Sequence, residues 1–484
     1  MIKASDLCLL LPQIIIAVSA IIVMLSIAIK RSHLFSYVFT LVALAIAFIS
    51  IYYVPAETSV TSLFVIDGFG LFMTGLIICA AFIVTLMSYH YLKVQEIKSE
   101  EYYILLLLAT LGSVTMVISS HFISFFLSLE VLSVSLFALI AYLKRKDFAI
   151  ESGIKYLVLA AVSTSFLLFG VALIYAETGH MDLAGISAAT ATNTSEGFLL
   201  VAGLALVIVG IGFKMALVPF HLWTPDIYSG ASAPVSAFVA TISKGAAFAF
   251  LLRLFYGIGG LKNESIWLSF AVIAAASMLI GNWLALRQQN IKRLLAYSSI
   301  SHLGYMMVAF LAMNQTGVHA VAFYLVVYFV SMLAAFGTVI YLSDKNGEAI
   351  NVEDYRGLFW RKPWLAGIFT VVLLSLAGIP LTAGFLGKFY LLTAGASAGI
   401  WTMMIILVVS SGIGLFYYLR VVAIMFSGKK ETVPEVAPTP LVLIGENSFP
   451  LKLILGVLFI LILWFGIYPS SLLSILQQMI SGIF

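Results

Sequence analysis

The stretch FLLVAGLALVIVGIGFKMALVPFHLWTPDIYSG, from Phe198 to Gly230, decides the fold of this chain. Its pattern is compatible with one helix about 50 Å long, which exceeds the hydrocarbon core of a bilayer, about 30 Å thick. Pro219 and Pro225 interrupt that helix, because each proline removes a backbone donor and clashes with the preceding turn. We therefore predict a broken membrane helix whose free carbonyl groups lie near Lys214, close to the middle of the stretch.

A second interrupted helix is predicted from Pro363 to Ala394. The sequence Ala377-Gly378-Ile379-Pro380 breaks the helical pattern there, and Lys388 follows the break. Interrupted segments in corresponding positions of two halves are the best sequence indication of an ion path through a membrane protein.

The composition indicates that lipid surrounds most of the chain. Apolar residues make up 62% of the 484 residues and charged residues 10%. The formal net charge of +4 is small and the basic residues lie in short loops, which excludes a nucleic-acid-binding patch. Cys8 and Cys79 are the only cysteines, too few for an iron–sulfur cluster or a zinc site, so redox centres must lie on other chains.

The apolar runs predict an all-α integral membrane protein with about fourteen transmembrane helices. Strands of a membrane barrel would alternate in polarity over about ten residues, which these runs do not do. The first run resembles a signal peptide, but it is too long and no small-residue cleavage site ends it. The predicted spans are 7–29, 35–53, 69–92, 103–119, 122–143, 154–176, 198–219, 231–257, 265–286, 294–313, 318–343, 363–393, 398–426 and 453–475.

Basic residues are concentrated in the loops that follow odd-numbered spans, which the positive-inside rule assigns to the cytoplasm. Both termini are then predicted to lie on the outer side of the membrane. The odd loops hold Lys30, Arg31, Lys93, Lys98, Lys144, Arg145, Lys146, Lys155, Arg287, Lys292, Arg293, Lys345, Arg356, Arg361, Lys362, Lys429, Lys430 and Lys452, whereas the other side holds Lys3, Arg253 and Lys262.

Two sets of five spans, 4–8 and 9–13, are predicted to form inverted repeats. In each set the fourth span is the interrupted one that carries a lysine. Because five is an odd number, the second set enters the membrane upside down relative to the first, which suggests two half-channels. The predicted domains are 1–102 with spans 1–3, 103–257 with the first repeat, 258–426 with the second repeat, and 427–484 with a cytoplasmic loop and span 14.

Four charged residues within membrane-length runs are the candidate site: Glu130, Lys214, Lys244 and Lys388. Such a residue costs at least about 2.5 kcal/mol near the bilayer centre, and it usually faces a bundle interior or a water path. From the estimated depth of each residue in the membrane, we predict a proton path that runs from Glu130 through Lys214 and Lys244 to Lys388. Burial disfavours the ammonium form of a lysine and a nearby carboxylate stabilises it, so a Glu130–Lys214 contact would act as a switch. Its opening would release a proton toward Lys244.

Each of these assignments has a structural alternative. Glu130 and Lys214 could form a static ion pair that locks two helices, although replacing such pairs by apolar groups is often neutral for stability. Lys388 could extend from a helix end to the lipid headgroups. Lys244 has no acidic residue in an adjacent span to neutralise it, which favours a functional role.

His302, in the predicted tenth span, could relay protons near neutral pH or could be a satisfied interior polar group. His221 and His319 are expected at membrane interfaces, and Arg420 is expected to anchor the cytoplasmic end of its span. The remaining histidines are expected in loops or at span ends, namely His33, His90, His121 and His180.

Two motifs resemble the antiporter-like membrane subunits of respiratory complex I. The first is GFKMALVPFHLWTPD, from Gly212 to Asp226, which continues to Ala233-Pro234-Val235-Ser236 and Ser243-Lys244. The second is NIKRLLAYSSISHLGY, from Asn290 to Tyr305. The chain length, the lysine in span 8 and the sequence around Lys388 are most similar to the subunit N group of bacterial NADH-quinone oxidoreductases, the counterparts of mitochondrial subunit 2.

The resemblance implies that Glu130, Lys214, Lys244 and Lys388 form a proton path driven by electron transfer from NADH to quinone. It also implies a bacterial plasma membrane location and other membrane subunits as partners. This chain would hold no metal or cofactor, because NADH, FMN, iron–sulfur clusters and quinone belong to partner subunits. Ser232 departs from the family, which commonly has proline there, so the local geometry at the start of span 8 is open.

Two other functions fit the same residues. A subunit of a multisubunit sodium/proton antiporter would share the fold and much of the charge pattern without a redox motor. A membrane scaffold with inert buried ions is the third hypothesis. Transport measurements on the reconstituted protein separate the three.

Overall fold

The computed structural model describes residues 4–56, 58–95, 99–143, 147–192, 197–345, 347–428 and 443–480. Most of the cytoplasmic loop predicted at the start of the 427–484 domain lies outside these residues. So do the loop charges Lys3, Lys98, Lys144, Arg145, Lys146, Lys429 and Lys430.

Thirteen crossings in the described part of the chain are helices long and apolar enough to span a membrane. A fourteenth is split into two shorter helices, so the predicted all-α membrane fold with about fourteen spans is confirmed. Twelve of the crossings are α2 (Leu11–Ile29), α3 (His33–Ser50), α4 (Gly68–Val94), α5 (Glu100–Val117), α6 (Phe122–Ile140), α7 (Asp147–Thr178), α9 (Phe198–Met215), α13 (Glu264–Leu286), α14 (Ile291–Leu311), α15 (Gln315–Leu342), α19 (Trp401–Phe426) and α20 (Phe449–Ile467).

Both predicted interruptions are present. The helix α9 ends at Met215, and after a non-helical turn the short helix α10 (Trp223–Gly230) follows. The fourteenth crossing consists of α17 (Pro363–Ala377) and α18 (Ala383–Ser397), separated by a turn that begins at Gly378. Each break thus falls where the prolines and glycines of the sequence place it.

The eighth predicted span is continuous but irregular. It consists of α11 (Ala233–Phe238), the π-helical segment η2 (Val239–Ser243) and α12 (Lys244–Gly257). Ser232, where the family commonly has proline, is the N-cap residue with extended backbone, and Pro234 occupies the first turn. The missing proline therefore does not disturb the start of this span, whereas the π-helical turn before Lys244 was not predicted.

Several elements were not predicted from the sequence. They are α1 (Ala4–Leu9), the hairpin of β1 (Thr58–Val60) and β2 (Phe64–Ile66), the short helices η1 (Ile51–Tyr53), α8 (Leu183–Thr192), η3 (Gly260–Lys262), η4 (Val352–Tyr355), α16 (Leu358–Arg361) and η5 (Ile444–Asn447), and the terminal helix α21 (Ser470–Met479). The hairpin pairs Ser59 with Val65 in antiparallel register. The last span was predicted to run to residue 475, but α20 ends at Ile467, because Pro469 cannot continue the helix.

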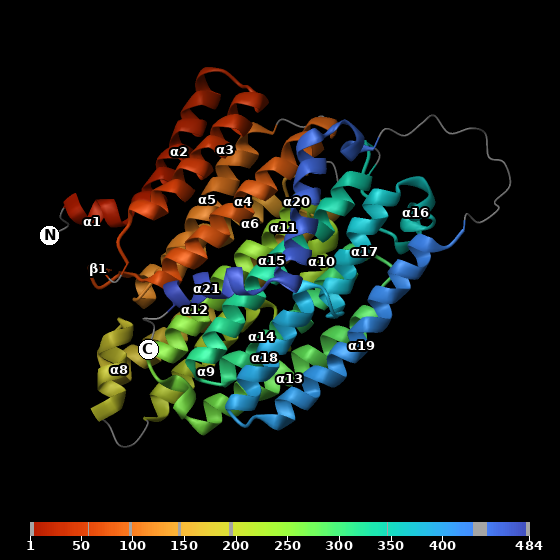
Figure 1. Cartoon of the computed structure of the whole chain (residues 1–484). Helices are drawn as coiled ribbons and strands as arrows, with labels where there is room; N and C mark the ends of the chain where they lie inside the picture. Colours follow the sequence, from red (N-terminus) through yellow and green to blue (C-terminus); the bar gives the residue numbers. More distant parts are fainter. Residues whose placement is uncertain are drawn as a thin grey trace.

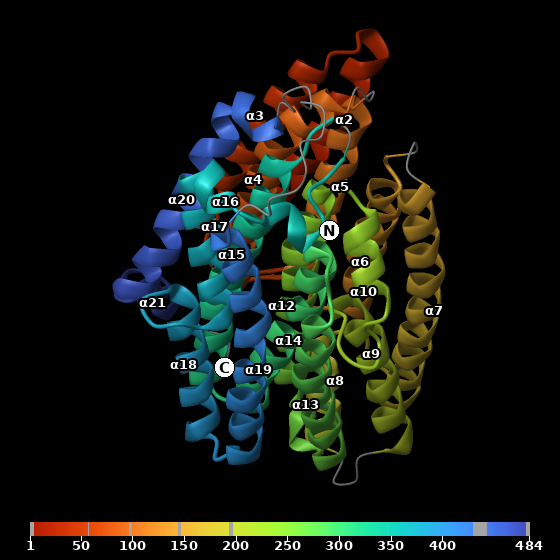
Figure 2. The ribbon, with the colours of Figure 1, turned by 90° about the vertical axis from the view of Figure 1, so that its right-hand side faces the viewer.

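The helices that carry Lys244 and His302 lie at the centre of the bundle, next to α15. Figure 1 shows α2 and α3 at one end of the molecule and α19 at the other, and Figure 2 shows α7 and α20 on opposite edges. In the most apolar part of each crossing, all residues of 233–257 are buried, and so are 94% of the residues of α14 and of α15. In α7 and α19 the buried share is 33%. The outer helices therefore face lipid and shield the central three.

An ion pair ties α4 to α12 at the membrane side opposite the basic loops. Asp67, the N-cap of α4, accepts two hydrogen bonds from the Arg253 guanidinium, at 2.7 and 2.8 Å. Burial alone raises the pKa of Asp67, but the nearby guanidinium and its hydrogen bonds outweigh burial and hold that pKa below its usual value. Arg253, counted among the charges of this side and within the predicted span 231–257, is thus a structural residue of that span.

Candidate functional site

Lys214 lies in the last turn of α9, directly before the break. The side chain is buried, and its Nζ donates hydrogen bonds to Ser133 Oγ on α6 and to the Tyr156 hydroxyl on α7, both at 3.0 Å. Both partners are hydroxyl groups, which can accept a proton on one side and donate one on the other. Lys214 is therefore held by groups that can take part in proton transfer.

Glu130 does not form the predicted contact with Lys214. Its Oε1 instead accepts a hydrogen bond of 3.2 Å from Thr164 on α7, and no ion pair joins the two side chains in the described structure. A hollow of about 10 Å³ is lined by Ser133, Thr164 and Lys214. A volume of that size is at the lower limit for one water molecule, so the hollow beside Lys214 and Thr164 fits one water and no more.

Lys244 begins α12, one residue after the π-helical turn. It is completely buried, and its Nζ donates a hydrogen bond of 2.7 Å to Ser299 Oγ on α14. The Tyr228 ring lies with its centroid 5.1 Å from the ammonium, which favours the cation. No carboxylate pairs with Lys244 in the described part of the chain, in agreement with the sequence.

Polar side chains extend from Lys244 along α14. Ser299 Oγ and the Tyr328 hydroxyl are 2.6 Å apart. One turn further, His302 is buried between two hydroxyls: Nδ1 lies 2.7 Å from the Tyr324 hydroxyl and Nε2 lies 3.1 Å from that of Tyr418. His302 is therefore a fully satisfied interior group with hydroxyl partners on both ring nitrogens, a geometry that suits either of the two predicted roles.

Lys388 lies in α18, after the break in its crossing, and points into the protein. Its Nζ donates to the carbonyl oxygens of Leu376 at 3.1 Å and Ala377 at 2.8 Å, and to Ser411 Oγ on α19 at 2.7 Å. The two carbonyls are free because the break at Gly378 removes their helical partners. The alternative that Lys388 extends to the lipid headgroups is therefore wrong.

His221 was expected at a membrane interface, and the structure shows that its side chain is buried within the protein. The residue lies in the turn between α9 and α10 and is 6% exposed, and neither ring nitrogen has a hydrogen-bond partner. Thr224 and Ser243 also have buried hydroxyl oxygens without partners. Buried polar atoms of this kind are usually satisfied by ordered water, so the region between Lys214 and Lys244 can be hydrated. The two prolines that flank His221 were the sequence signal for its depth.

Lys292 was expected in a loop, but it is completely buried at the start of α14. Its Nζ lies 2.7 Å from Glu348 Oε2, and the Glu348 side chain is only 7% exposed. Glu348 lies in the segment after α15, far from Lys292 in sequence, so no local pattern indicates this ion pair. Arg420, by contrast, lies where it was expected, at the basic-loop end of α19, where it donates to the carbonyls of Leu286 and Gln288.

The four charged residues do not touch one another. They occupy the fifth, seventh, eighth and twelfth crossings, on α6, α9, α12 and α18, and hydroxyl and aromatic side chains contact the three lysines. The Trp223 ring lies between the surroundings of the two lysines. Its centroid is 5.0 Å from that of the Tyr156 ring, whose hydroxyl bonds Lys214, and 6.0 Å from Lys244 Nζ. No direct hydrogen bond links Lys214 to Lys244 in the residues described, so a proton would need water to pass between them.

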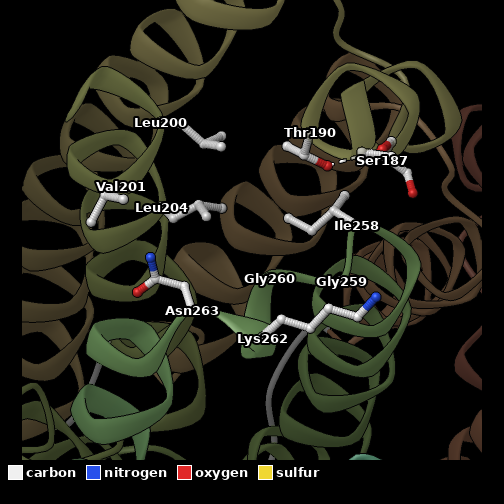
Figure 3. Close-up of a pocket in the computed structure, with 11 residues that line it drawn as sticks. Ser187, Thr190, Leu200, Val201, Leu204, Ile258, Gly259, Gly260, Lys262 and Asn263 are labelled. Atoms are coloured by element: carbon white, nitrogen blue, oxygen red, sulfur yellow. Dashed lines mark hydrogen bonds between the residues drawn. The ribbon is translucent and has the colours of Figure 1, made fainter. Parts of the chain in front are cut away.

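A cavity lies away from these residues, at the end of the bundle opposite the basic loops. It has a volume of about 160 Å³ and is lined by α8, α9 and the turn before α13 (Figure 3). Lys262 and Asn263 are its most polar lining residues. Across the described ranges, no three His, Cys, Asp or Glu side chains come together in a way that could hold a metal ion.

The fold and the site together define a class: a multi-pass membrane protein with two broken helices and a row of buried ammonium groups through its centre. Residues 119–414 match the family described as NADH:quinone oxidoreductase/Mrp antiporter, transmembrane. The chain belongs to this family.

Solved structures agree with this assignment. A chain of respiratory complex I from Thermus thermophilus is 32% identical, with 96% of this chain and 98% of that chain covered and a TM-score of 0.80. A chain of an archaeal membrane-bound sulfane sulfur reductase is 25% identical, with 99% and 98% covered and a TM-score of 0.84. A chain of the Mrp complex from Dietzia sp. DQ12-45-1b has the same fold, at 20% identity, 99% and 97% coverage and a TM-score of 0.83.

Proposed function

We propose that this chain is the subunit N type of antiporter-like membrane subunit in a proton-translocating NADH-quinone oxidoreductase. The observation that carries the proposal is the set of three buried lysines, each bonded to a hydroxyl group, on the seventh, eighth and twelfth crossings of a chain that belongs to this family. Its similarity over nearly its whole length to a chain of Thermus thermophilus complex I favours the redox-driven member of the family.

In this proposal Glu130 controls Lys214. With the carboxylate held by Thr164, as here, Lys214 has only neutral partners. Movement of Glu130 into contact would stabilise the ammonium form, and its return would favour release of the proton toward Lys244. Moving one charge against 100 mV requires about 2.3 kcal/mol, which a change of partner for a buried ammonium can supply.

From Lys244 the proton would pass toward Lys388 by way of Ser299, Tyr328 and His302. Each of these groups has a hydroxyl or ring nitrogen that gives up one proton as it gains another, so no net charge stays behind. Lys388 would hand the proton to Ser411, because its other two partners are carbonyls that cannot carry a proton. Water would complete the gaps between these groups.

The remaining parts of the assignment concern what surrounds the chain. NADH oxidation, flavin, iron–sulfur and quinone chemistry would belong to partner subunits, and this chain would contribute proton translocation without reacting covalently. Other membrane subunits of a large hetero-oligomeric complex would be its partners. We place it in a bacterial plasma membrane with the basic loops in the cytoplasm and both termini outside.

The test uses the assembled complex in membrane vesicles. Lys214→Ala and Glu130→Ala should each lower NADH-driven proton pumping, measured with a pH-sensitive dye, while the amount of assembled complex stays near that of the parent. Lys244→Arg should also impair pumping, because arginine stays protonated and cannot relay. Parent-level pumping in Lys244→Arg would remove that residue from the path, and loss of assembly in both of the first two variants would favour a purely structural role for Glu130 and Lys214.

A subunit of a sodium/proton antiporter is the second candidate, since the family description includes Mrp antiporters and the fold of one is the same. Sodium-dependent proton movement in vesicles without NADH would support it. Pumping that depends on NADH and is indifferent to sodium would exclude it. Intact pumping after Lys244→Ala would instead support a scaffold with inert ions.

A further inference from the structure

Helix α14 carries a row of residues that leads from the basic-loop side of the membrane to the centre of the proposed path. Lys292, Ala296 and Ser299 are spaced by four and three residues, so they lie on one face of the helix. All three are buried. Ser299 accepts the hydrogen bond from Lys244. Lys292 therefore marks the membrane-surface end of the same face that contacts the central lysine.

The Lys292–Glu348 ion pair closes this end with four short contacts. Lys292 Nζ donates to Glu348 Oε2 at 2.7 Å and to the Ala231 carbonyl at 2.6 Å. Glu348 Oε1 accepts from the Tyr91 hydroxyl at 2.6 Å and from the Ala233 backbone N–H at 2.8 Å. One carboxylate thus joins α4, α11 and α14 at a single point.

Glu348 belongs to a covering segment, residues 347–352, which lies over the start of α14. Backbone hydrogen bonds join the segment to the turn that precedes α14. They run from Ile291 N to Ile350 O at 2.7 Å and from Val352 N to Gln289 O at 2.8 Å. These two bonds hold the segment at its far end. The Glu348 carboxylate bonds the near end to α4 and α11, and a turn also holds that end, from Asp344 N to Gly347 O at 2.9 Å and from Gly347 N to Asp344 Oδ1 at 3.0 Å.

Polar groups continue from the ion pair toward Lys244. Lys292 bonds to the α10–α11 junction, where Ser236 Oγ donates to the Tyr228 carbonyl at 2.9 Å. The Tyr228 hydroxyl lies 3.5 Å from Ser299 Oγ, and Lys244 Nζ lies 2.7 Å from the same oxygen. The region between the covering segment and Lys244 therefore contains hydroxyl and carbonyl groups.

A purely structural role explains this ion pair poorly. Desolvation of two charges costs several kcal/mol per ion before their attraction is counted, and apolar replacements of such pairs are often neutral or stabilising. A pair that can separate, on a segment held at both ends by backbone bonds and joined to α4 and α11 through Glu348, is suited to a contact that opens and closes.

We propose that the Lys292–Glu348 pair is a gate between Lys244 and the water on the basic-loop side of the membrane. With the pair formed, the covering segment seals the α14 face. With the pair separated, water reaches Ser299, and Lys244 exchanges its proton with that side. The inference rests on the proposed function, in which Lys244 is a proton carrier.

The experiment measures access to the sealed face in the assembled complex. Ala296→Cys, in a chain with Cys8→Ala and Cys79→Ala, places one thiol between Lys292 and Ser299. The vesicles are prepared with the basic-loop side outward, and a membrane-impermeant cationic methanethiosulfonate is added. We expect slow labelling in this parent and at least about tenfold faster labelling when Glu348→Gln is added, because loss of the carboxylate charge frees the covering segment. Vesicles of opposite orientation should show no such increase.

Arg293→Gln is the matched control. It removes the neighbouring ion pair of Arg293 with Asp226, which is about one-third exposed on both sides and lies off this face. Its labelling rate should equal that of the parent, and a rise as large as with Glu348→Gln would overturn the gate. If the glutamine variant does not assemble, Glu348→Asp replaces it. Aspartate keeps the charge, but its shorter side chain places the carboxylate farther from Lys292. This variant should label a few times faster, and a parent-like rate would also overturn the gate.

The labelling does not depend on pumping, so the two proposals fail separately. Unchanged labelling in Glu348→Gln together with lost pumping in Lys244→Ala refutes the gate and leaves the path standing. Normal pumping in Lys244→Ala refutes the path and, with it, a gate that serves Lys244.

Discussion

The two broken crossings hold their lysines in opposite ways. Lys214 lies before its break and bonds to two hydroxyl side chains on neighbouring helices. Lys388 lies after its break and bonds to two backbone carbonyls of the break itself, plus one hydroxyl. Side chains can rotate away and carbonyls of a fixed turn cannot. The first lysine is therefore held by a movable site and the second by a rigid one.

The turns differ in the same sense. The α9 turn places Ala216 at φ 61°, a left-handed conformation that costs a non-glycine residue about 1–2 kcal/mol. The α17 turn uses Gly378 at φ 84°, where a Cβ would lie 2.8 Å from Lys388 Cδ. Each turn thus holds one non-glycine residue in a left-handed conformation, Ala216 in the first and Leu381, at φ 74°, in the second. The turns differ in that the second is built around its lysine, because Gly378 lies against the Lys388 side chain.

The largest contrast is expected when each lysine is replaced by methionine. Both variants should lose pumping by about tenfold or more, since each removes a proton carrier. Lys388→Met should also reduce the amount of assembled complex, because two buried carbonyls lose their donor at about 1–3 kcal/mol each. Lys214→Met should assemble normally, since its two hydroxyl partners can find other bonds. Vesicle pumping and quantification of the complex on native gels measure both effects, and equal assembly of the two variants would contradict the contrast.

A smaller contrast is expected at the turns. Gly378→Ala forces a left-handed alanine against Lys388, so we expect a loss of stability of about 1–3 kcal/mol and displacement of the ammonium. Ala216→Gly relieves strain but adds freedom to the unfolded chain, so its net effect should be within about 0.5 kcal/mol. Thermal inactivation of the purified complex compares them. A destabilisation by Ala216→Gly as large as that by Gly378→Ala would show that the first turn is as rigid as the second.

The smallest contrast concerns single hydroxyl groups. Ser411→Ala removes the one partner of Lys388 that can carry a proton, and we expect pumping to fall several-fold. Ser133→Ala leaves Lys214 with Tyr156, so pumping should change by less than about twofold, within the usual effect of one redundant hydrogen bond. Initial rates of dye quenching decide between them, and a larger effect of Ser133→Ala would mean that Tyr156 does not serve Lys214.

Much of this fold follows from the sequence, because a membrane span must be long, apolar and helical. Pro219 and Pro225 located one break, and Gly378 with Pro380 located the other. The four charged residues were found because a charge in a long apolar run has so few structural explanations. The Lys214 partners were not predicted, since the choice between Glu130, Ser133 and Tyr156 depends on side-chain rotamers across three helices.

What the sequence missed depends on contacts between distant segments or on irregular backbone. Glu348 reaches Lys292 by a loop that folds back over α14, and neither residue looks unusual in its own surroundings. His221 was assigned to an interface because it lies beside Trp223, and its burial in the turn between α9 and α10 was not predicted. The ending of α20 at Ile467 was missed because the apolar pattern continues past Pro469.

The wide turn before Lys244 changes how this crossing must be mapped. A π-helical turn takes in one residue more than an α-helical turn, which rotates everything beyond it by about 100° about the axis. A helical wheel drawn through 233–257 as one regular helix would therefore assign Lys244 and the residues after it to the wrong side. Cysteine or tryptophan scans of this crossing need separate periodicities for Ala233–Phe238 and Lys244–Gly257, with the phase reset between them.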